Sequence, residues 1–256
     1  MALFSYPGGA SNAVKKLLKY FPPHRVYVEP FVGGGSAFFA KDLAEVNVIN
    51  DKDTAIIAIY DAARTGGLEK CADGFPVDRD LFDRSCKMQE KDPCAQLACR
   101  KLSYQGNRKN WMGDKTASTK SNGRVGGNLR RELERLVPKL QRATISNLDF
   151  EEVMRKWDGP DTFFFLDPPW YDLVYADKFY KEGDQNRELL ERVAKVCGEM
   201  QGKVMVIYNM HPDVRRAFTD QGFTEFRVDI VRTAQAGVTV PVARYVACNW
   251  DPRTGV

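Results

Sequence analysis

The segment FFFLDPPWYD, residues 163–172, sharply restricts what this chain can fold into. It opens with four consecutive apolar residues, which suit a strand buried on both faces, as a central strand of a parallel sheet is. Pro168 and Pro169 lack backbone N–H groups and have fixed φ, so the chain must leave the sheet there. A parallel sheet would therefore deliver Asp167 to its carboxyl edge, where open α/β folds bind ligands.

The N-terminal quarter contains a glycine-rich turn between two strand-like segments. RVYVEPF, residues 25–31, predicts a short buried strand, VGGGS follows as a tight turn, and SAFFAKDLA, residues 36–44, predicts a helix. EVNVIND, residues 45–51, predicts a second strand, and residues 54–64 predict a helix with one apolar face. A strand–turn–helix–strand unit indicates a parallel sheet.

The same alternation returns in the second half of the chain. The predicted elements are strands at 143–150, 163–167 and 204–208, helices at 187–200 and 212–222, and two extended strands at 223–233 and 242–250. The last two close the sheet as a hairpin. The predicted fold class is therefore α/β, with a mostly parallel sheet and a C-terminal antiparallel hairpin. A chain of 256 residues fits one large domain, or one domain with a sizeable insertion.

Residues 66–140 interrupt this alternation. Residues 103–128 are rich in Gly, Asn, Ser and Lys and predict a polar loop, with helices at 92–102 and 128–140 on either side. Residues 100–135 hold ten basic and three acidic side chains, a net charge of +7 in a chain whose total is +4. Such a basic block suggests a polyanionic partner, and a solvated charged face is the alternative.

The six cysteines form no C-x-x-C pair, and His24 and His211 are the only histidines. A structural zinc site is therefore not expected. We expect free, buried thiols in a reducing compartment, because cytosolic proteins rarely keep disulfides. No apolar run approaches the roughly 20 residues of a membrane span and no secretory signal opens the chain, so we expect a cytoplasmic protein.

The glycine turn predicts a nucleoside-binding site. Gly33 and Gly35 let the backbone approach a ligand closely, and Asp51, at the end of the next strand, can accept hydrogen bonds from both hydroxyls of a ribose. Phe38 stands where the third glycine of a dinucleotide fingerprint would be, and no phosphate-cradling Gly-Lys-Ser/Thr follows. A purely structural turn is the alternative.

The DPPW segment predicts a site for a planar amino group. The Asp167 carboxylate and the Pro168 carbonyl are two acceptors held close together, which matches the two donors of an exocyclic amine. Trp170 adds a flat face on which a base can stack, worth about 1–3 kcal/mol. The alternative is a Pro-Pro turn beside a core tryptophan.

Five motifs in order resemble those of the Dam-like (D12 class) adenine-specific DNA N6-methyltransferases. They are YPGG at 6–9, EPFVGGGSAFF at 29–39, IND at 49–51, NLDF at 147–150 and LDPPW at 166–170. The resemblance spans nearly the whole chain. It implies a Rossmann-like S-adenosylmethionine-dependent methyltransferase fold, with a catalytic domain at 1–65 and 141–256 and a small helical target-recognition insertion at 66–140.

The resemblance also implies roles for individual residues. The cofactor would be bound by Tyr6, Ala10, Glu29, Phe31, Gly33, Gly35, Ser36, Asp51, Asp149, Phe150 and Asp167, and the target base by Asp167, Pro168, Pro169 and Trp170. Glu29 would face the methionine moiety, Asp51 the ribose, and Asp149 with Phe150 the cofactor adenine. The candidate nucleic-acid contacts are Arg108, Lys109, Asn110, Lys115, Lys120, Arg124, Arg130 and Arg131.

Two positions depart from the family pattern. Ala10 stands where the family usually has a lysine that contacts cofactor or target, and Lys15 and Lys16 are the nearest substitutes. Trp170 replaces the commoner Tyr or Phe, which keeps an aromatic face. Residues 106–110 match the family's loop pattern only loosely, so the target sequence stays open.

The implied reaction is transfer of a methyl group from S-adenosylmethionine to adenine N6 in double-stranded DNA, with S-adenosylhomocysteine as product. Asp at position 167, rather than Ser, favours adenine over cytosine. An RNA substrate, or a catalytically weak binding module, is the alternative. A monomer is expected, and a cognate restriction endonuclease is a conceivable partner.

Overall fold

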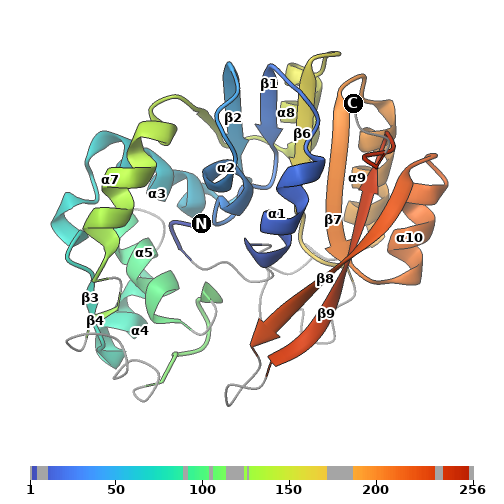
Figure 1. Ribbon diagram of the computed structural model, residues 1–256. Helices are drawn as coiled ribbons and strands as arrows, with labels where there is room; N and C mark the ends of the chain where they lie inside the picture. Colours follow the sequence, from blue (N-terminus) through green and yellow to red (C-terminus); the bar gives the residue numbers. More distant parts are fainter. Residues whose placement is uncertain are drawn as a thin grey trace.

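The larger strands form one seven-stranded sheet (Figure 1). The computed structural model describes residues 2–4, 11–88, 92–103, 106–113, 124–125, 127–171, 187–233 and 239–253. The strand order is β5-β2-β1-β6-β7-β9-β8. The strands are β1 (Val26–Glu29), β2 (Val46–Asn50), β5 (Thr144–Ser146), β6 (Thr162–Leu166), β7 (Lys203–Asn209), β8 (Thr224–Thr233) and β9 (Thr239–Cys248).

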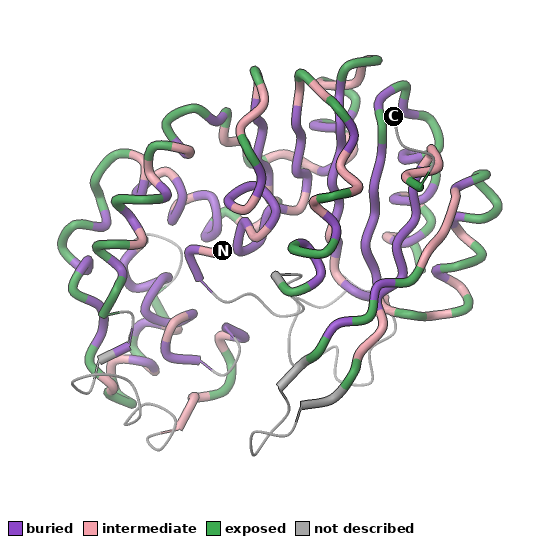
Figure 2. Tube along the Cα trace, viewed as in Figure 1, coloured by how far each residue is buried: buried purple, intermediate pink, exposed green. Residues whose placement is uncertain are grey.

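The pairing confirms the predicted fold class. β5, β2, β1, β6 and β7 pair in parallel, while β9 runs antiparallel to both β7 and β8. All five residues of β6 are buried, as expected for a central strand with both faces covered. Figure 2 shows these central strands as continuous buried segments.

Helices cover both faces of the sheet. The helices that cover the sheet are α1 (Ser11–Leu17), α2 (Ser36–Ala40), α3 (Thr54–Thr65), α8 (Phe150–Trp157), α9 (Arg187–Glu199) and α10 (Pro212–Thr219), with a short 3-10 helix η1 (Leu18–Tyr20). Successive side chains of β6 alternate between two apolar clusters: Phe163 and Phe165 pack with α1, α2 and α3, while Phe164 and Leu166 pack with α8, α9 and α10. The sheet is therefore the middle of three layers.

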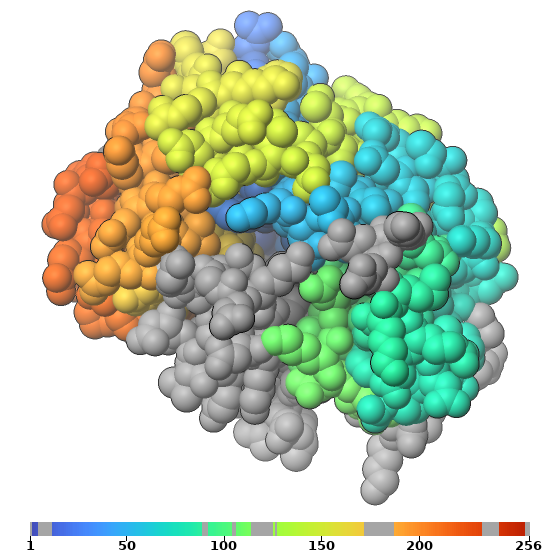
Figure 3. Space-filling view, turned by 180° about the vertical axis from the view of Figure 1, so that it is seen from behind, coloured from blue at the N-terminus to red at the C-terminus, as the bar shows by residue number. Residues whose placement is uncertain are grey.

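A small helical lobe occupies the sequence between β2 and β5. Its elements are η2 (Glu69–Cys71), β3 (Phe75–Pro76), α4 (Arg79–Lys87), α5 (Pro93–Leu102), β4 (Arg124–Val125) and α7 (Leu129–Leu140), with β3 and β4 paired antiparallel. Leu97 and Leu133 belong to the same apolar cluster as Ile56 and Ile59 of α3. The lobe therefore packs on the core, and its green residues form one side of the molecule in Figure 3.

Several predicted boundaries differ from the structure. The helix predicted over 36–44 ends at Ala40, and the strand predicted over 143–150 is limited to Thr144–Ser146. The strand is short because Asp149 caps a helix that begins at Phe150, with its carboxylate accepting from the Glu151 N–H. Helices α1, α4 and α8 and the β3–β4 pair were not predicted. Of the predicted loop, the structure describes 103, 106–113, 124, 125, 127 and 128.

The expectation of six free thiols is wrong for four of them. Helices α4 and α5 pack together, and disulfides join Cys86 to Cys99 and Cys71 to Cys94, with Cα atoms 5.0 and 6.0 Å apart. These separations fall within the usual disulfide range. Cys197 and Cys248 are the free cysteines, and both are buried. Over the described residues, no helix is long and apolar enough to cross a membrane.

The disulfides can be tested by alkylation. Denatured, unreduced protein should take up alkylating reagent at Cys197 and Cys248 alone, and at all six cysteines after reduction. Replacing Cys86 and Cys99 by alanine should lower the free energy of unfolding by about 3 kcal/mol. The bridge joins residues 13 apart in sequence, and a closed loop of that size restricts the unfolded chain by about this amount. Peptide mapping of the alkylated sites and urea unfolding are the measurements. Alkylation of all six cysteines without reductant would contradict the pairing.

Candidate active site

The candidate site lies at the carboxyl edge of the sheet. Because β1, β2, β5 and β6 are parallel, the segments that follow them emerge at the same edge. The glycine turn follows β1, Asp51 follows β2, Asp149 follows β5 and Asp167 follows β6. The strand order reverses between β1 and β6, which is where open α/β sheets form their binding crevice.

Asn50 ties three of these segments together. Its Nδ2 donates to the carbonyls of Pro30 (3.0 Å) and Leu148 (2.9 Å). Its Oδ1 accepts from Ser146 Oγ (2.8 Å) and the Leu148 N–H (2.9 Å). The side chain is fully buried, and all four of its hydrogen-bonding positions are used. The ends of β1, β2 and β5 are therefore fixed relative to one another.

The glycine turn is built around positive φ angles. Gly33 has φ 46° and Gly35 has φ 72°, a region that other residues rarely adopt. A Cβ on Gly35 would lie 2.8 Å from the Tyr60 hydroxyl, so a side chain would not fit. The Tyr60 hydroxyl donates to the Gly33 carbonyl at 2.8 Å. Ser36, half-buried, then begins α2.

Asp51 is bonded directly to this turn. Its Oδ2 accepts from the Gly33 N–H at 2.9 Å, and its Oδ1 accepts from the Asp53 N–H at 2.9 Å. Burial raises the pKa of Asp51 to about 6, against the opposing effect of these two hydrogen bonds. Each oxygen keeps a lone pair, so the carboxylate can still accept from a ligand.

Glu29 lies beneath the turn and is buried. One of its oxygens accepts from the Tyr27 hydroxyl (2.7 Å) and the Phe38 N–H (2.9 Å). Burial raises the pKa of Glu29 to about 8, and the nearby negative charge of Asp167 acts in the same direction. The Glu29 carboxyl is therefore hydrogen-bonded within the protein, and it lies near Asp167, the residue that follows β6.

Phe31 and Phe150 form an aromatic wall beside the turn. Their rings stack with centroids 5.2 Å apart, and the Arg192 guanidinium lies 5.0 Å from the Phe150 centroid. Arg192 also donates to Asp149 at 2.9 Å. The structure therefore brings Phe31, a predicted cofactor-binding residue, next to Asp149 and Phe150, which were predicted at the cofactor adenine, and it adds Arg192 of α9.

Trp170 of the DPPW segment is more buried than expected for a residue that stacks on a base. Asp167 and Pro169 are half-buried and Pro168 is buried, but Trp170 is only 5% exposed. The Arg244 guanidinium of β9 lies 3.9 Å from the centroid of the Trp170 ring. One face of Trp170 therefore carries a cation, and the ring belongs to the apolar cluster that includes Leu166 and Val206, as the alternative of a core tryptophan has it.

Two hydrogen bonds hold the residue after Trp170. Asn209, the last residue of β7, donates from Nδ2 to the Tyr171 carbonyl at 2.8 Å. The Tyr171 hydroxyl donates to Asp213 at 3.2 Å. The exit from β6 is therefore attached to β7 and α10.

Among the described residues, four charges of the basic block lie close to carboxylates of the same chain. Arg130 pairs with Glu69 (3.1 Å) and Asp73 (3.0 Å), and Arg108 lies 3.6 Å from Asp53. Lys109, Asn110 and Arg131 are exposed. Arg100 and Lys101, also counted in the block, pair with Asp53 and Glu132. The charge offered to a partner is consequently smaller than the sequence count suggests.

Some expected site residues are not placed. Tyr6, Ala10, Lys115 and Lys120 lie outside the described residues, as does the side chain of Arg124. Lys16, considered as a substitute for the family lysine, donates to the Asp229 carbonyl of β8 at 2.6 Å, and Lys15 is exposed.

Four residues that shape the site were not predicted from the sequence. Asn50 was recognisable as an amide at the end of an apolar strand, and Arg244 as a charge inside one. Arg100 was counted only as part of the basic block, and Arg192 gave no signal apart from its place on a predicted helix.

The fold and the site together define a class. A strand, a glycine turn, a helix and a second strand ending in a carboxylate, in a sheet closed by an antiparallel hairpin, form the Rossmann-like fold of the S-adenosylmethionine-dependent methyltransferases. Residues 6–78 match the family model of the D12 class N6 adenine-specific DNA methyltransferases, which confirms the resemblance over the first three of the five motifs.

Individual relatives are distant. The chain is 23% identical over 240 residues to a DNA N-6-adenine-methyltransferase of Escherichia phage P1, covering 87% of this chain but 31% of that protein. A precorrin-6y C5,15-methyltransferase from Geobacter metallireducens GS-15 aligns with TM-score 0.44 and 10% identity, over 94% of this chain and 86% of the other. A SAM-dependent O-methyltransferase from Thermotoga maritima aligns with TM-score 0.38 and 9% identity, over 93% and 63%.

Asn50 provides a test of how the site is held. Asn50→Ala leaves four buried or partly buried polar groups without their partner, so we expect it to lower the free energy of unfolding by about 3 kcal/mol. Asn147→Ala is the control, because Asn147 is exposed and makes one bond, to the Asp51 carbonyl. Urea unfolding followed by circular dichroism measures both. A loss for Asn50→Ala no larger than that of the control would refute the role of Asn50.

Proposed function

We propose that this chain transfers a methyl group from S-adenosylmethionine to N6 of adenine in double-stranded DNA. The observation that carries the proposal is that two carboxylates, those of Asp51 and Asp167, follow parallel strands at the same edge of the sheet. Asp51, bonded to the glycine turn, follows β2, and Asp167 follows β6 on the other side of β1. A nucleoside and an amine would thus be held on opposite sides of the switch point.

The residues at the turn fit the cofactor. The positive φ angles of Gly33 and Gly35 would let the backbone turn at the edge of the ligand, and the free lone pairs of Asp51 would accept from the two ribose hydroxyls. Asp149 would accept from the amino group of the cofactor adenine, whose ring would lie against Phe31 and Phe150. When bound, S-adenosylmethionine supplies an electrophilic methyl group on a sulfonium, and the carboxylate of Asp167 would provide negative potential near it. Glu29, whose pKa is raised to about 8, would face the methionine moiety as a neutral carboxyl near pH 7. Tyr6, Ala10 and Ser36 complete the proposed contacts.

The DPPW segment would hold the target base. The Asp167 carboxylate and the Pro168 carbonyl accept the two amino hydrogens and draw N6 toward tetrahedral geometry, with its lone pair free. The lone pair of N6 would displace sulfur at the methyl carbon, so that an N–C bond forms as the S–C bond breaks. S-adenosylhomocysteine would leave, and the proton of the methylated nitrogen would pass to water. Positioning and electrostatics supply the catalysis, with no covalent intermediate on the protein. Trp170 would border the base through the small part of its ring that stays exposed.

The helical lobe would contact the DNA. A base inside a duplex must flip out to reach Asp167, which costs a few kcal/mol. Phosphate contacts from exposed residues of the lobe would offset this cost and make affinity salt-dependent. The proposed contacts are Arg108, Lys109, Asn110, Lys115, Lys120, Arg124, Arg130 and Arg131.

A transfer assay tests the reaction and its centre. Purified protein with tritiated S-adenosylmethionine and unmethylated duplex DNA should yield label in N6-methyldeoxyadenosine after digestion to nucleosides. Asp167→Ala should lower the rate by about a thousandfold or more, since it removes one of two acceptors and a charge. Asp161→Ala is the matched control, because Asp161 is an exposed carboxylate just before the other end of β6.

The outcomes separate the possibilities. Label that survives in a folded Asp167→Ala protein would refute the catalytic assignment. Label in RNA but not in DNA would move the substrate to RNA. Cofactor binding without transfer to either nucleic acid would favour a binding module and point to Ala10 as the cause.

Cofactor binding should depend on pH through Asp51. The pKa of Asp51 is raised to about 6, and only the ionised form offers all its lone pairs to the ribose. Affinity for S-adenosylhomocysteine should therefore be constant near pH 7 and fall about tenfold per pH unit well below pH 6. Calorimetric titration from pH 5 to 7 measures it. Asp51→Asn is the control and should bind weakly without this dependence; a flat wild-type profile would contradict the role of Asp51.

A further inference from the structure

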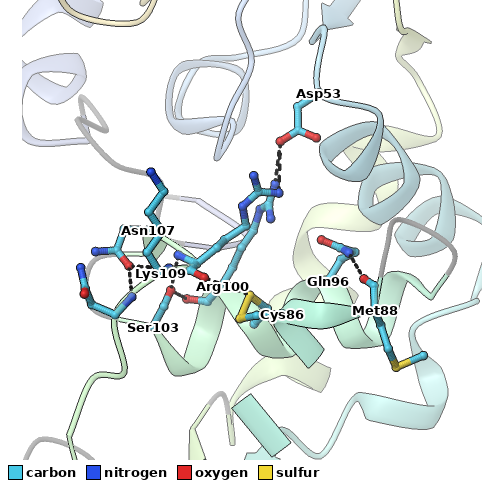
Figure 4. Close-up of a disulfide and its surroundings, with 11 residues drawn as sticks. Asp53, Cys86, Met88, Gln96, Arg100, Ser103, Asn107 and Lys109 are labelled. Carbon is cyan, nitrogen blue, oxygen red and sulfur yellow. Dashed lines mark hydrogen bonds and ion pairs between the residues drawn. A yellow bond between two sulfur atoms is a disulfide. The ribbon is translucent and has the colours of Figure 1, made fainter. Parts of the chain in front are cut away.

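Arg100 is a buried cation at the junction of the helical lobe and the core. It belongs to α5 and is 1% exposed. Its Nη2 donates to Asp53 Oδ2 at 3.1 Å, and its Cζ lies 5.4 Å from the ring centroid of Phe4, near the N-terminus. Figure 4 shows Arg100 reaching from the lobe toward Asp53. The catalytic steps proposed above make no use of this residue.

Asp53 connects Arg100 to the ribose acceptor. Its Oδ1 caps α3 by accepting from the Ala55 N–H at 3.0 Å, and its Oδ2 accepts from Arg100. Its own N–H donates to Asp51 Oδ1 at 2.9 Å. A displacement of the Asp53 carboxylate would therefore move the N-terminus of α3 and the N–H that orients Asp51.

The ion pair is poorly accessible to water. The Asp53 side chain is 14% exposed, so removing Arg100 would leave a largely buried carboxylate without its main partner. Arg108 also lies near Asp53, at 3.6 Å, but its side chain is 33% exposed. Arg100 is thus the fixed partner of Asp53, and Arg108 is the one that a solvent anion can reach.

The lobe holds Arg100 through short covalent and hydrogen-bonded links. The neighbouring Cys99 is joined to α4 by the disulfide with Cys86. Ser103 Oγ donates to the Arg100 carbonyl at 3.1 Å and accepts from the Arg108 N–H at 3.1 Å. Asn107 Oδ1 accepts from the N–H groups of the two residues after Arg108. Residues 107–110, which include three of the candidate nucleic-acid contacts, are therefore linked through Ser103 to the backbone of Arg100 (Figure 4).

We propose that Arg100 is a positioning residue for the cofactor: from the lobe it fixes Asp53, which in turn orients the ribose acceptor Asp51. The inference rests on the proposed function, because it takes Asp51 as the ribose acceptor. It goes further in making the ribose site depend on a residue of the lobe. Any shift of α5 on contact with a nucleic acid would then change cofactor affinity, and the cofactor would change nucleic-acid affinity by the same factor.

The two members of the ion pair act oppositely on Asp51. The charged groups near it are the Asp53 carboxylate and the Arg100 guanidinium, with Arg108 beyond Asp53 and Glu29 beneath the turn; the Tyr60 hydroxyl lies above Gly33. The Arg100 cation favours ionised Asp51, whereas the Asp53 anion disfavours it. A positioning role through this pair therefore predicts pH shifts of opposite sign for the two substitutions.

The test is calorimetric binding of S-adenosylhomocysteine from pH 5 to 7 by folded variants of the full chain. Arg100→Met should weaken binding about tenfold at pH 6 and move the midpoint of the pH dependence up by a few tenths of a unit. Asp53→Asn, which can still cap α3, should move the midpoint down. Arg64→Met is the control: Arg64 pairs with Asp61 at the far end of α3 and should leave the profile unchanged.

Each result decides the proposal. Opposite midpoint shifts support it. Unchanged binding by both variants, or equal weakening without a midpoint shift, would overturn it, because a merely structural role predicts no opposite signs. Should Arg100→Met fail to fold, Asp53→Asn decides alone: a lower midpoint supports the inference and an unchanged one overturns it. Failure of the wild type to bind S-adenosylhomocysteine would instead refute the proposed function.

Discussion

The four hydrogen bonds of Asn50 are the contact on which the candidate site depends. Parallel strands place their carboxyl ends at one edge, but they do not by themselves fix the loops that leave those ends. Asn50 joins the chain after β1 to the chain after β5, from its own position at the end of β2. The glycine turn, the carboxylate of Asp51 and the cap of α8 all start within a few residues of this junction. Their relative placement is therefore set by one buried amide.

The helical lobe is more than an appendage to this edge. Its apolar residues share a cluster with α3, and two disulfides stiffen α5 against its neighbours. Arg100 of α5 is hydrogen-bonded to Asp53, which lies next to the proposed ribose acceptor. The pairing of Arg108 and Arg130 with acidic side chains shows that part of the positive charge serves internal contacts. If the lobe contacts nucleic acid as proposed, its hydrogen bond to this sheet edge gives nucleic acid and cofactor a direct route by which to influence each other.

The sequence predicted what depends on local pattern. The apolar run before Asp167 and the glycines at 33 and 35 identified buried strands and a tight turn, and the alternation of strands with helices predicted a mostly parallel sheet. Local sequence patterns did not predict the tertiary contacts. Pairing of cysteines depends on how α4 and α5 pack, and the burial of Trp170 depends on Arg244, a residue of a strand distant in sequence. The short β5 depended on Asp149 acting as a helix cap rather than as the end of a strand.

The most direct test of the central claim is the structure of the protein crystallised with S-adenosylhomocysteine. The account predicts the two ribose hydroxyls within hydrogen-bonding distance of Asp51, the adenine between Asp149 and the Phe31–Phe150 wall, and the sulfur directed toward Asp167. Asn50 should keep its four bonds. A ligand bound away from the glycine turn, or a ribose that makes no contact with Asp51, would contradict the account.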